Sequence, residues 1–153
     1  MSGAVQAARL SAALWECDRH RAELLNALDE WCRAPAPNIA TLEQSAAMRR
    51  LTDQIIYRFT KLQDAMGERL VPSTLATLRE PFEDWSMRDR LDRLERLGFL
   101  DVDAWLQWRD VRNRLAHEYP DQAELRFAAL LAAVDAAQRM AQAYDRWKIS
   151  LPN

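Results

Sequence analysis

Apolar residues return every three or four positions along most of the chain, which is the spacing of amphipathic α-helices. The first run of this kind covers residues 4–33 and the second covers residues 40–68. The first carries Leu10, Leu14, Cys17, Leu24, Leu28 and Trp31, and the second carries Met48, Leu51, Ile55, Phe59, Leu62 and Met66. Arg21 falls on the first apolar stripe, either as a side chain that extends its charge into water or as a polar group that faces an interface.

Proline, glycine and capping residues mark the breaks between the expected helices. A proline-containing connector spans residues 34–38, and Gly67 is expected to stop the second helix. The less regular stretch 71–85 leaves room for a short helix. Ser86 and Gly98 have the positions of an N-cap and a C-cap around one more short helix.

Two further helices complete the pattern. One is expected over residues 102–118, because Pro120 disfavours helical geometry at Tyr119. The last begins at Asp121, and its apolar stripe consists of Phe127, Leu130, Val134, Ala137, Ala141 and Tyr144. We therefore predict an all-α fold, an antiparallel helical bundle of four main helices plus one short helix. A single domain over residues 1–153 is expected, with its core at about 5–147.

Composition narrows the class of protein. With 49% hydrophobic and 29% charged residues, the chain has the make-up of a globular domain that needs no disulfide or metal to fold. A net charge of -2 gives no overall basic field that would announce nucleic acid. The two cysteines, Cys17 and Cys32, are expected about 22 Å apart on one helix, too far for a disulfide.

Several site types are not expected. Two histidines and two separated cysteines do not make a structural zinc site, and no glycine-rich phosphate loop is present, so we predict neither a metal nor a cofactor. The chain has no signal peptide pattern and no apolar run long enough to cross a bilayer. A reduced, cytoplasmic protein without a membrane partner is the expectation.

The helix expected over 102–118 carries two stripes. Ala104, Trp108, Val111 and Leu115 form one face, which we expect to enter the core. Val102, Leu106, Arg109, Asn113 and His117 form the opposite face. Because a surface helix of a monomer has no need of apolar residues on its outer side, Val102, Leu106 and Arg109 predict the interface of a two-fold homodimer. The alternative is that Val102 and Leu106 pack under a neighbouring loop.

Candidate chemistry gathers in residues 112–119. Arg112, Asn113, His117 and Tyr119 place a guanidinium, an amide, an imidazole and a phenol within eight residues. Histidine is the side chain best suited to proton transfer near neutral pH, so His117 is the first candidate, whereas His20 is expected at the surface. Arg112 lies five residues before His117, about 140° away on a helix, so the two face one substrate only if the helix end unwinds or if two subunits combine.

The pattern Arg-x4-His-x-Tyr, with Asn113 after the arginine, resembles the HEPN superfamily, and among its members the HepT-type toxins. The segments 94–100 and 105–109 resemble the same family, so its specific part spans residues 94–119 and its general part about 5–147.

The resemblance implies a homodimeric, metal-independent endoribonuclease that acts as the toxin of a toxin–antitoxin pair. It implies that His117, Arg112 and Asn113 are catalytic, with RNA as the substrate. It also implies that an MntA-type nucleotidyltransferase antitoxin attaches AMP to Tyr119 and silences the toxin.

Other interpretations stay open from the sequence. The chain could be a non-catalytic substrate-binding or adaptor subunit of a minimal nucleotidyltransferase, with the histidine motif as a structural element of the dimer. It could also be a plain helical interaction module. Tyr119 could be a packing tyrosine with a satisfied hydroxyl. Trp105 and Trp108 have the chemistry to stack on bases, although Trp108 is expected in the core.

Overall fold

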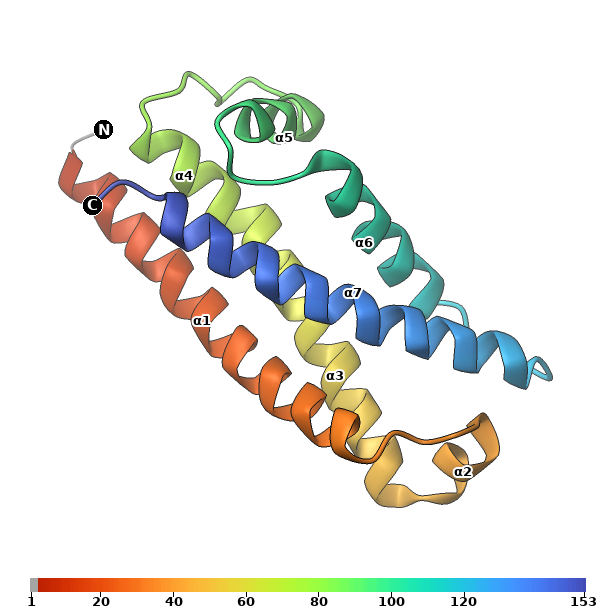
Figure 1. The fold of residues 1–153 in the computed structure, drawn as a ribbon. Coiled ribbons are helices and arrows are strands. Elements are labelled where there is room, and N and C mark those ends of the chain that lie inside the picture. Colours follow the sequence, from red (N-terminus) through yellow and green to blue (C-terminus); the bar gives the residue numbers. More distant parts are fainter. Residues whose placement is uncertain (1–2) are drawn as a thin grey trace.

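The computed structural model describes residues 3–153, and every regular element in that range is helical (Figure 1). The elements are α1 (Gly3–Arg33), α2 (Ile39–Gln44), α3 (Ala46–Ala65), the π-helical turn η1 (Met66–Leu70), α4 (Val71–Thr77), α5 (Met87–Arg96), α6 (Val102–Leu115) and α7 (Ala123–Ser150). The predicted all-α helical bundle is confirmed. Among these helices, none combines the length and the apolar character that crossing a membrane requires.

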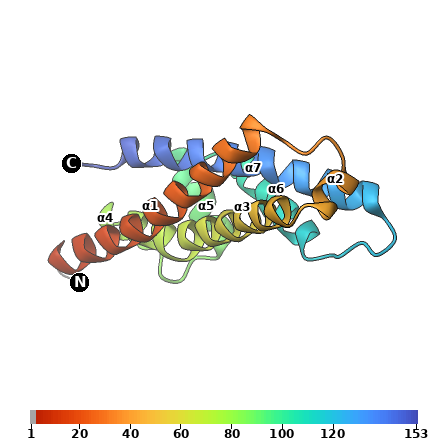
Figure 2. The same cartoon turned by 90° about the horizontal axis from the view of Figure 1, so that it is seen from below.

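Long helices that run side by side form the body of the molecule. The rod made of α3, η1 and α4 packs antiparallel to α1, and α7 packs against α1, α3 and α6 (Figures 1 and 2). The short α5 lies at the end where α4 stops and α6 begins, and α2 lies at the opposite end. The loop between α6 and α7 is also at that opposite end, so the segment that carries His117 and Tyr119 lies near α2.

The core lies between α1, the α3–α4 rod and α7. Tyr144 and Trp147 of α7 are fully buried, and the indole nitrogen of Trp147 donates to the Thr74 hydroxyl at 3.0 Å. The predicted α7 stripe enters this core apart from Phe127, which is half-buried; its buried members are Leu130, Val134, Ala137, Ala141 and Tyr144. The alanines allow α7 to approach its neighbours closely.

The α3–α4 rod corrects two expectations. The single helix expected over residues 40–68 is interrupted at Ser45. The Ser45 hydroxyl caps α3 by accepting a hydrogen bond from the Met48 amide at 3.2 Å. Gly67 does not stop it, and helical structure continues to Thr77. Pro72 has no amide hydrogen to donate, and the wider turn η1 precedes it, closed by a bond from the Val71 amide to the Met66 carbonyl.

The caps of α5 follow the prediction. The Ser86 hydroxyl accepts from the Asp89 amide at 3.1 Å. Gly98 adopts a φ of +87°, and the Phe99 amide reaches back to the Leu94 carbonyl at 2.9 Å. This is the Schellman motif, which favours glycine at the left-handed position. It turns Phe99 into the core, where the ring lies 5.8 Å from that of Trp147.

The side chain of Arg21 faces α7. Its guanidinium binds Asp145 in a two-pronged ion pair, with Nε–Oδ1 at 2.5 Å and Nη2–Oδ2 at 2.8 Å. Beside it, Asp18 accepts from the Tyr144 hydroxyl at 2.7 Å and from Lys148 at 2.8 Å. Arg21 is therefore a polar group at an interface, which was one of its two interpretations. That interface is the contact between α1 and α7 within the chain.

His20 is buried, at 9% exposure, and the expectation of a surface histidine is wrong. Its Nδ1 lies 3.0 Å from a guanidinium nitrogen of Arg58, and its Nε2 lies 3.8 Å from a carboxylate oxygen of Glu16. Burial, and then the positive charge of Arg58, lower the pKa of His20. The ring is therefore neutral at pH 7 and accepts the Arg58 hydrogen bond.

This buried imidazole predicts a loss of stability in mild acid. Between the lowered pKa of folded His20 and its ordinary value of about 6.5 when unfolded, the unfolded chain binds more protons. The free energy of unfolding should therefore fall as the pH drops from 7.5 towards 5.5. Urea titrations followed by circular dichroism measure this slope, which should be shallower in His20→Gln. Equal slopes in the two proteins would contradict the prediction.

Candidate functional site

The site is built on α6 and on the loop that follows it. The Asp101 carboxylate caps the start of α6 by accepting from the Ala104 amide at 3.1 Å, and Glu95 of α5 accepts from the Val102 amide at 2.7 Å. The helix ends at Leu115, so the expected end at residue 118 is wrong. The amides of Ala116 and His117 bond to carbonyls three residues back, which tightens the last turn. His117 thus stands outside the helix.

The buried face of α6 differs from the predicted one. Val102, Trp105 and Trp108 are its buried residues, and Val102 is only 3% exposed. Leu106 is half-buried against the core, while Arg109 is exposed. Val102 is thus buried within one chain, as the alternative to a dimer interface had it. The residues that bury it belong to the core and not to a loop alone. Val102 therefore no longer supports a homodimer interface. Of the three residues predicted for that interface, Arg109 is the one that is exposed.

Arg112 points from α6 towards α3. Its guanidinium forms an ion pair with Asp64 and lies 3.4 Å from the Gln63 side-chain oxygen. Gln63 is 3% exposed, and its amide nitrogen has no hydrogen-bond partner. A charge-assisted bond of this kind fixes a guanidinium in direction. Asp64 therefore holds Arg112 at the surface of α3 and balances its charge.

A pocket of about 510 Å³ opens beside this ion pair. Its wall combines both signs of charge with an indole and an amide, from Gln63, Asp64, Gly67, Glu68, Met87, Trp105, Arg109, Arg112 and Asn113. Trp105 lies beside Gly67 in this wall, where a Cβ atom on residue 67 would be 3.4 Å from the indole, an ordinary contact distance. Two cations and the Asn113 amide give the pocket groups that hold phosphate oxygens.

His117 and Tyr119 lie together on the loop after α6. Their ring centroids are 5.8 Å apart, with His117 exposed and Tyr119 half-buried. Tyr119 has a φ of +47° and Asp121 a φ of +60°, and the Gln122 amide bonds to the Tyr119 carbonyl at 3.1 Å. Pro120 thus occupies the second position of a tight turn whose third residue is left-handed. The turn delays α7, which begins at Ala123 and not at the expected Asp121.

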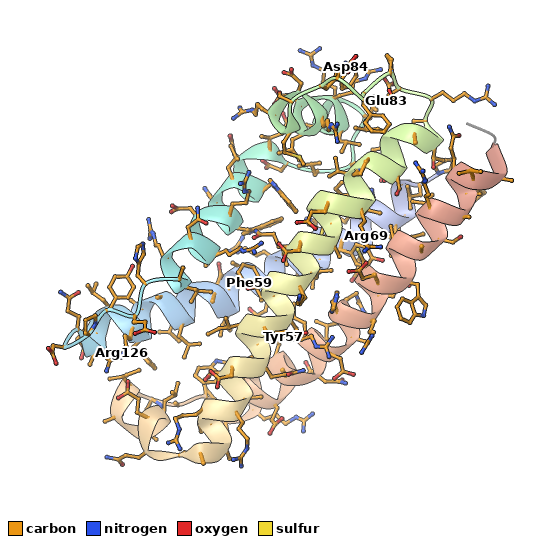
Figure 3. All side chains as sticks on the ribbon, turned by 180° about the vertical axis from the view of Figure 1, so that it is seen from behind. Tyr57, Phe59, Arg69, Glu83, Asp84 and Arg126 are labelled. Atoms are coloured by element: carbon orange, nitrogen blue, oxygen red, sulfur yellow. The ribbon has the colours of Figure 1, made fainter. Side chains whose placement is uncertain are left out.

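Arg126 of α7 fastens this loop to α2, which lies at the same end of the bundle. One guanidinium nitrogen donates to the Tyr119 carbonyl at 3.1 Å, and two others reach Glu43 of α2 at 3.0 and 2.7 Å. Figure 3 shows Arg126 between α7 and the end of the molecule that carries α2. Tyr119 is therefore held through its backbone, and within residues 3–153 its hydroxyl makes no hydrogen bond.

The structure brings together only some of the predicted residues. Arg112, Asn113 and Arg109 line one pocket, and His117 pairs with Tyr119 outside it. Sequence reasoning missed Asp64, Gln63 and Arg126. Asp64 lies 48 residues from Arg112 in the sequence, and Glu43 lies 83 residues from Arg126, so no local pattern could have identified these two pairs.

The possible ligands of a metal are scattered over the described part of the chain. Within residues 3–153, no three histidine, cysteine, aspartate or glutamate side chains gather in a group that could hold a metal ion. The pocket holds two guanidinium groups, from Arg109 and Arg112, and two carboxylates, from Asp64 and Glu68. Comparisons of the chain with family models, with curated proteins and with solved structures gave no match.

Proposed function

We propose that this protein is the toxin of a toxin–antitoxin pair, a metal-independent endoribonuclease that acts as a homodimer in the cytoplasm. The observation that carries the proposal is that one short segment presents an anchored arginine in a pocket and an exposed histidine on the loop that follows. Arg112 is held beside Asn113 in a pocket of nucleotide-compatible size, and His117 stands free on the adjoining loop. The motif's resemblance to HepT-type toxins supplies the reaction class.

The reaction uses the 2′-hydroxyl of RNA as its nucleophile. Its oxygen forms a new bond to the adjacent phosphorus while the bond from phosphorus to the 5′ oxygen breaks, leaving a 2′,3′-cyclic phosphate and a 5′-hydroxyl. One proton leaves the 2′-hydroxyl and one arrives at the 5′ oxygen, and His117 is the group proposed to move them. Arg112 stabilises the charge that develops on the phosphorane, and Asn113 positions a phosphate oxygen.

A homodimer resolves the separation between Arg112 and His117. His117 is outside the pocket that Arg112 and Asn113 line. Two-fold symmetry doubles every surface group, so one subunit's His117 can face the other subunit's Arg112.

Tyr119 is the proposed point of control. Its hydroxyl is spare, and its ring lies beside that of His117. An MntA-type nucleotidyltransferase would transfer AMP from ATP to this hydroxyl, forming a phenol–phosphate bond, releasing pyrophosphate and giving up the phenolic proton. The added anion would occupy the space in front of His117 and repel the phosphates of RNA.

Two measurements test the proposal. Purified, unmodified protein in EDTA should cut RNA and leave ends that carry 2′,3′-cyclic phosphate. After co-expression with a minimal nucleotidyltransferase from the neighbouring reading frame, the intact mass should rise by about 329 Da per AMP, and the gain should be absent in Tyr119→Phe. Intact RNA together with an unchanged mass would favour the non-catalytic adaptor subunit instead.

A further inference from the structure

A second group of side chains lies where α1 and α3 run side by side (Figures 1 and 3). Trp15 and Arg19 come from α1, and Tyr57, Arg58 and Lys61 come from α3. We name these five residues the aromatic–cationic face. Trp15 is 66% exposed and Tyr57 is 50% exposed, and within residues 3–153 no other aromatic side chain is as open to solvent. Large rings left in water indicate a binding surface.

Each exposed ring has a cation over it. The Arg19 guanidinium lies 5.8 Å from the centre of the Trp15 ring. Over Tyr57, the Arg58 guanidinium is at 5.3 Å and the Lys61 ammonium at 5.7 Å. These are the distances of cation–π contacts, which hold long, flexible cations in place at a surface. The rings and the charges therefore form one ordered arrangement.

His20 joins the two halves of the face. Its hydrogen bond with Arg58 crosses from α1 to α3. After the larger effect of burial, the charges of Arg58, Arg19 and Lys61 lower the pKa of His20, and the carboxylate of Glu16 raises it. Trp15 and Tyr57 thus belong to one surface and not to two unrelated positions.

The face carries three cations, Arg19, Arg58 and Lys61, in a chain whose net charge is -2. Arg69 is a fourth cation, but its guanidinium pairs with the Glu16 carboxylate at 3.0 Å. Within the described residues, Arg19 and Lys61 form no ion pair. The remaining charge on Arg19, Arg58 and Lys61 is available to an anionic partner.

The same face continues towards the candidate site. Tyr57, Lys61 and Asp64 follow one another on α3 at steps of four and three, so they lie on one side of the helix. Asp64 is the residue that holds Arg112. Seven residues of helix separate Tyr57 from Asp64, a rise of about 10 Å. A ligand lying along α3 would reach both places.

We propose that the aromatic–cationic face binds single-stranded RNA, with bases stacked on Trp15 and Tyr57 and phosphates paired with Arg19 and Lys61. Exposed rings interleaved with cations are the common means of holding a flexible strand without reading its sequence. The inference rests on the proposed function, because it makes this strand the continuation of the RNA that is cut near Arg112. A protein partner is less well matched, since the exposed apolar residues Leu131 and Ile149 lie on α7 and not on this face.

The test measures binding of a fluorescein-labelled 2′-O-methyl oligouridine of roughly twelve nucleotides, a length within known single-strand site sizes. This probe has no 2′-hydroxyl nucleophile and cannot be cut. We expect the double variant Trp15→Ala/Tyr57→Ala to lower the affinity by about 5-fold or more in fluorescence anisotropy, since one stacked base is worth at least that much. The matched control, Leu131→Ala/Ile149→Ala, removes exposed apolar side chains elsewhere and should bind like the wild type.

Salt dependence tests the cations separately. Lys61→Gln should reduce the slope of log affinity against log salt by about 0.7, the value for one phosphate contact in single strands. Arg139→Gln, an exposed cation on α7, should leave the slope unchanged. Thermal melting of each variant checks that these surface changes keep the fold.

Three results would overturn the inference. One is equal affinity of the double variant and its control. Another is a change in sedimentation of the double variant, which would make the face a contact between copies of the chain. The third is that the double variant no longer co-purifies with a co-expressed protein, while its affinity for the oligonucleotide is unchanged. A protein that binds the probe through this face but leaves RNA intact would instead refute the proposed nuclease, so the two failures are distinguishable.

Discussion

His117→Ala should reduce RNA cleavage by about 10²–10⁴-fold, the usual contribution of a positioned proton-transfer group. His117 is exposed on a loop, so its removal should leave the melting temperature nearly unchanged. In cells, expression of the wild type should arrest growth, and expression of the variant should not. Cleavage rate per folded protein is the decisive measurement, made on unmodified protein in EDTA.

The neighbouring Glu118 provides the control for this variant. Its side chain is exposed on the same loop, and Glu118→Ala should cut RNA and arrest growth like the wild type. If purified wild type left RNA intact and His117→Ala behaved identically in the growth assay, the nuclease would be ruled out. A plain interaction module predicts that outcome, because it makes no chemical use of His117.

The second large effect is recovery of activity in mixed dimers. Arg112→Ala and His117→Ala should each be inactive as homodimers. Co-expression with two different affinity tags, followed by two successive purifications, isolates dimers with one copy of each variant. Such a dimer retains one Arg112 and one His117, on different subunits. If the site is shared across the interface, the mixed dimer should cut RNA at a substantial fraction of the wild-type rate.

The result depends on where the two residues meet. A site complete within one chain would give mixed dimers as inactive as either parent, which would contradict the shared cleft. Arg112→Ala also leaves Asp64 without its ion-pair partner, so its folding has to be checked by circular dichroism. Arg114→Ala is the matched control, because the one ion pair that Arg114 forms within residues 3–153 is with Asp110, on an exposed flank of α6.

Local signals in the sequence were sufficient for much of the fold. The spacing of apolar residues predicted the helices, and Ser86 and Gly98 predicted the caps of α5, because a cap is decided by residues three or four positions away. The end of α6 was placed three residues late. Pro120 marks where helical geometry must stop, but the chain leaves the helix earlier to form the turn at Tyr119.

Contacts between distant segments could not be predicted in the same way. Val102 looked exposed on a helical projection, yet α5 and the core cover it. Asp64 and Arg112 are far apart in the chain, and so are Glu43 and Arg126, so their pairing depends on how whole helices pack. The candidate residues on α6 could be identified from their order, whereas the groups that orient them required the structure.

Tyr119 is held through its backbone carbonyl, so mutation can change its side-chain hydroxyl and its backbone contacts separately. Arg126 and Gln122 both donate hydrogen bonds to the carbonyl of Tyr119, and within residues 3–153 neither donates one to the phenol. Tyr119→Phe should therefore leave the loop in place and remove only the hydroxyl. Arg126→Ala should loosen the loop and keep the hydroxyl. A covalent mark on that hydroxyl would add bulk and charge to a backbone already fixed, and its removal would return the loop to the same geometry without refolding.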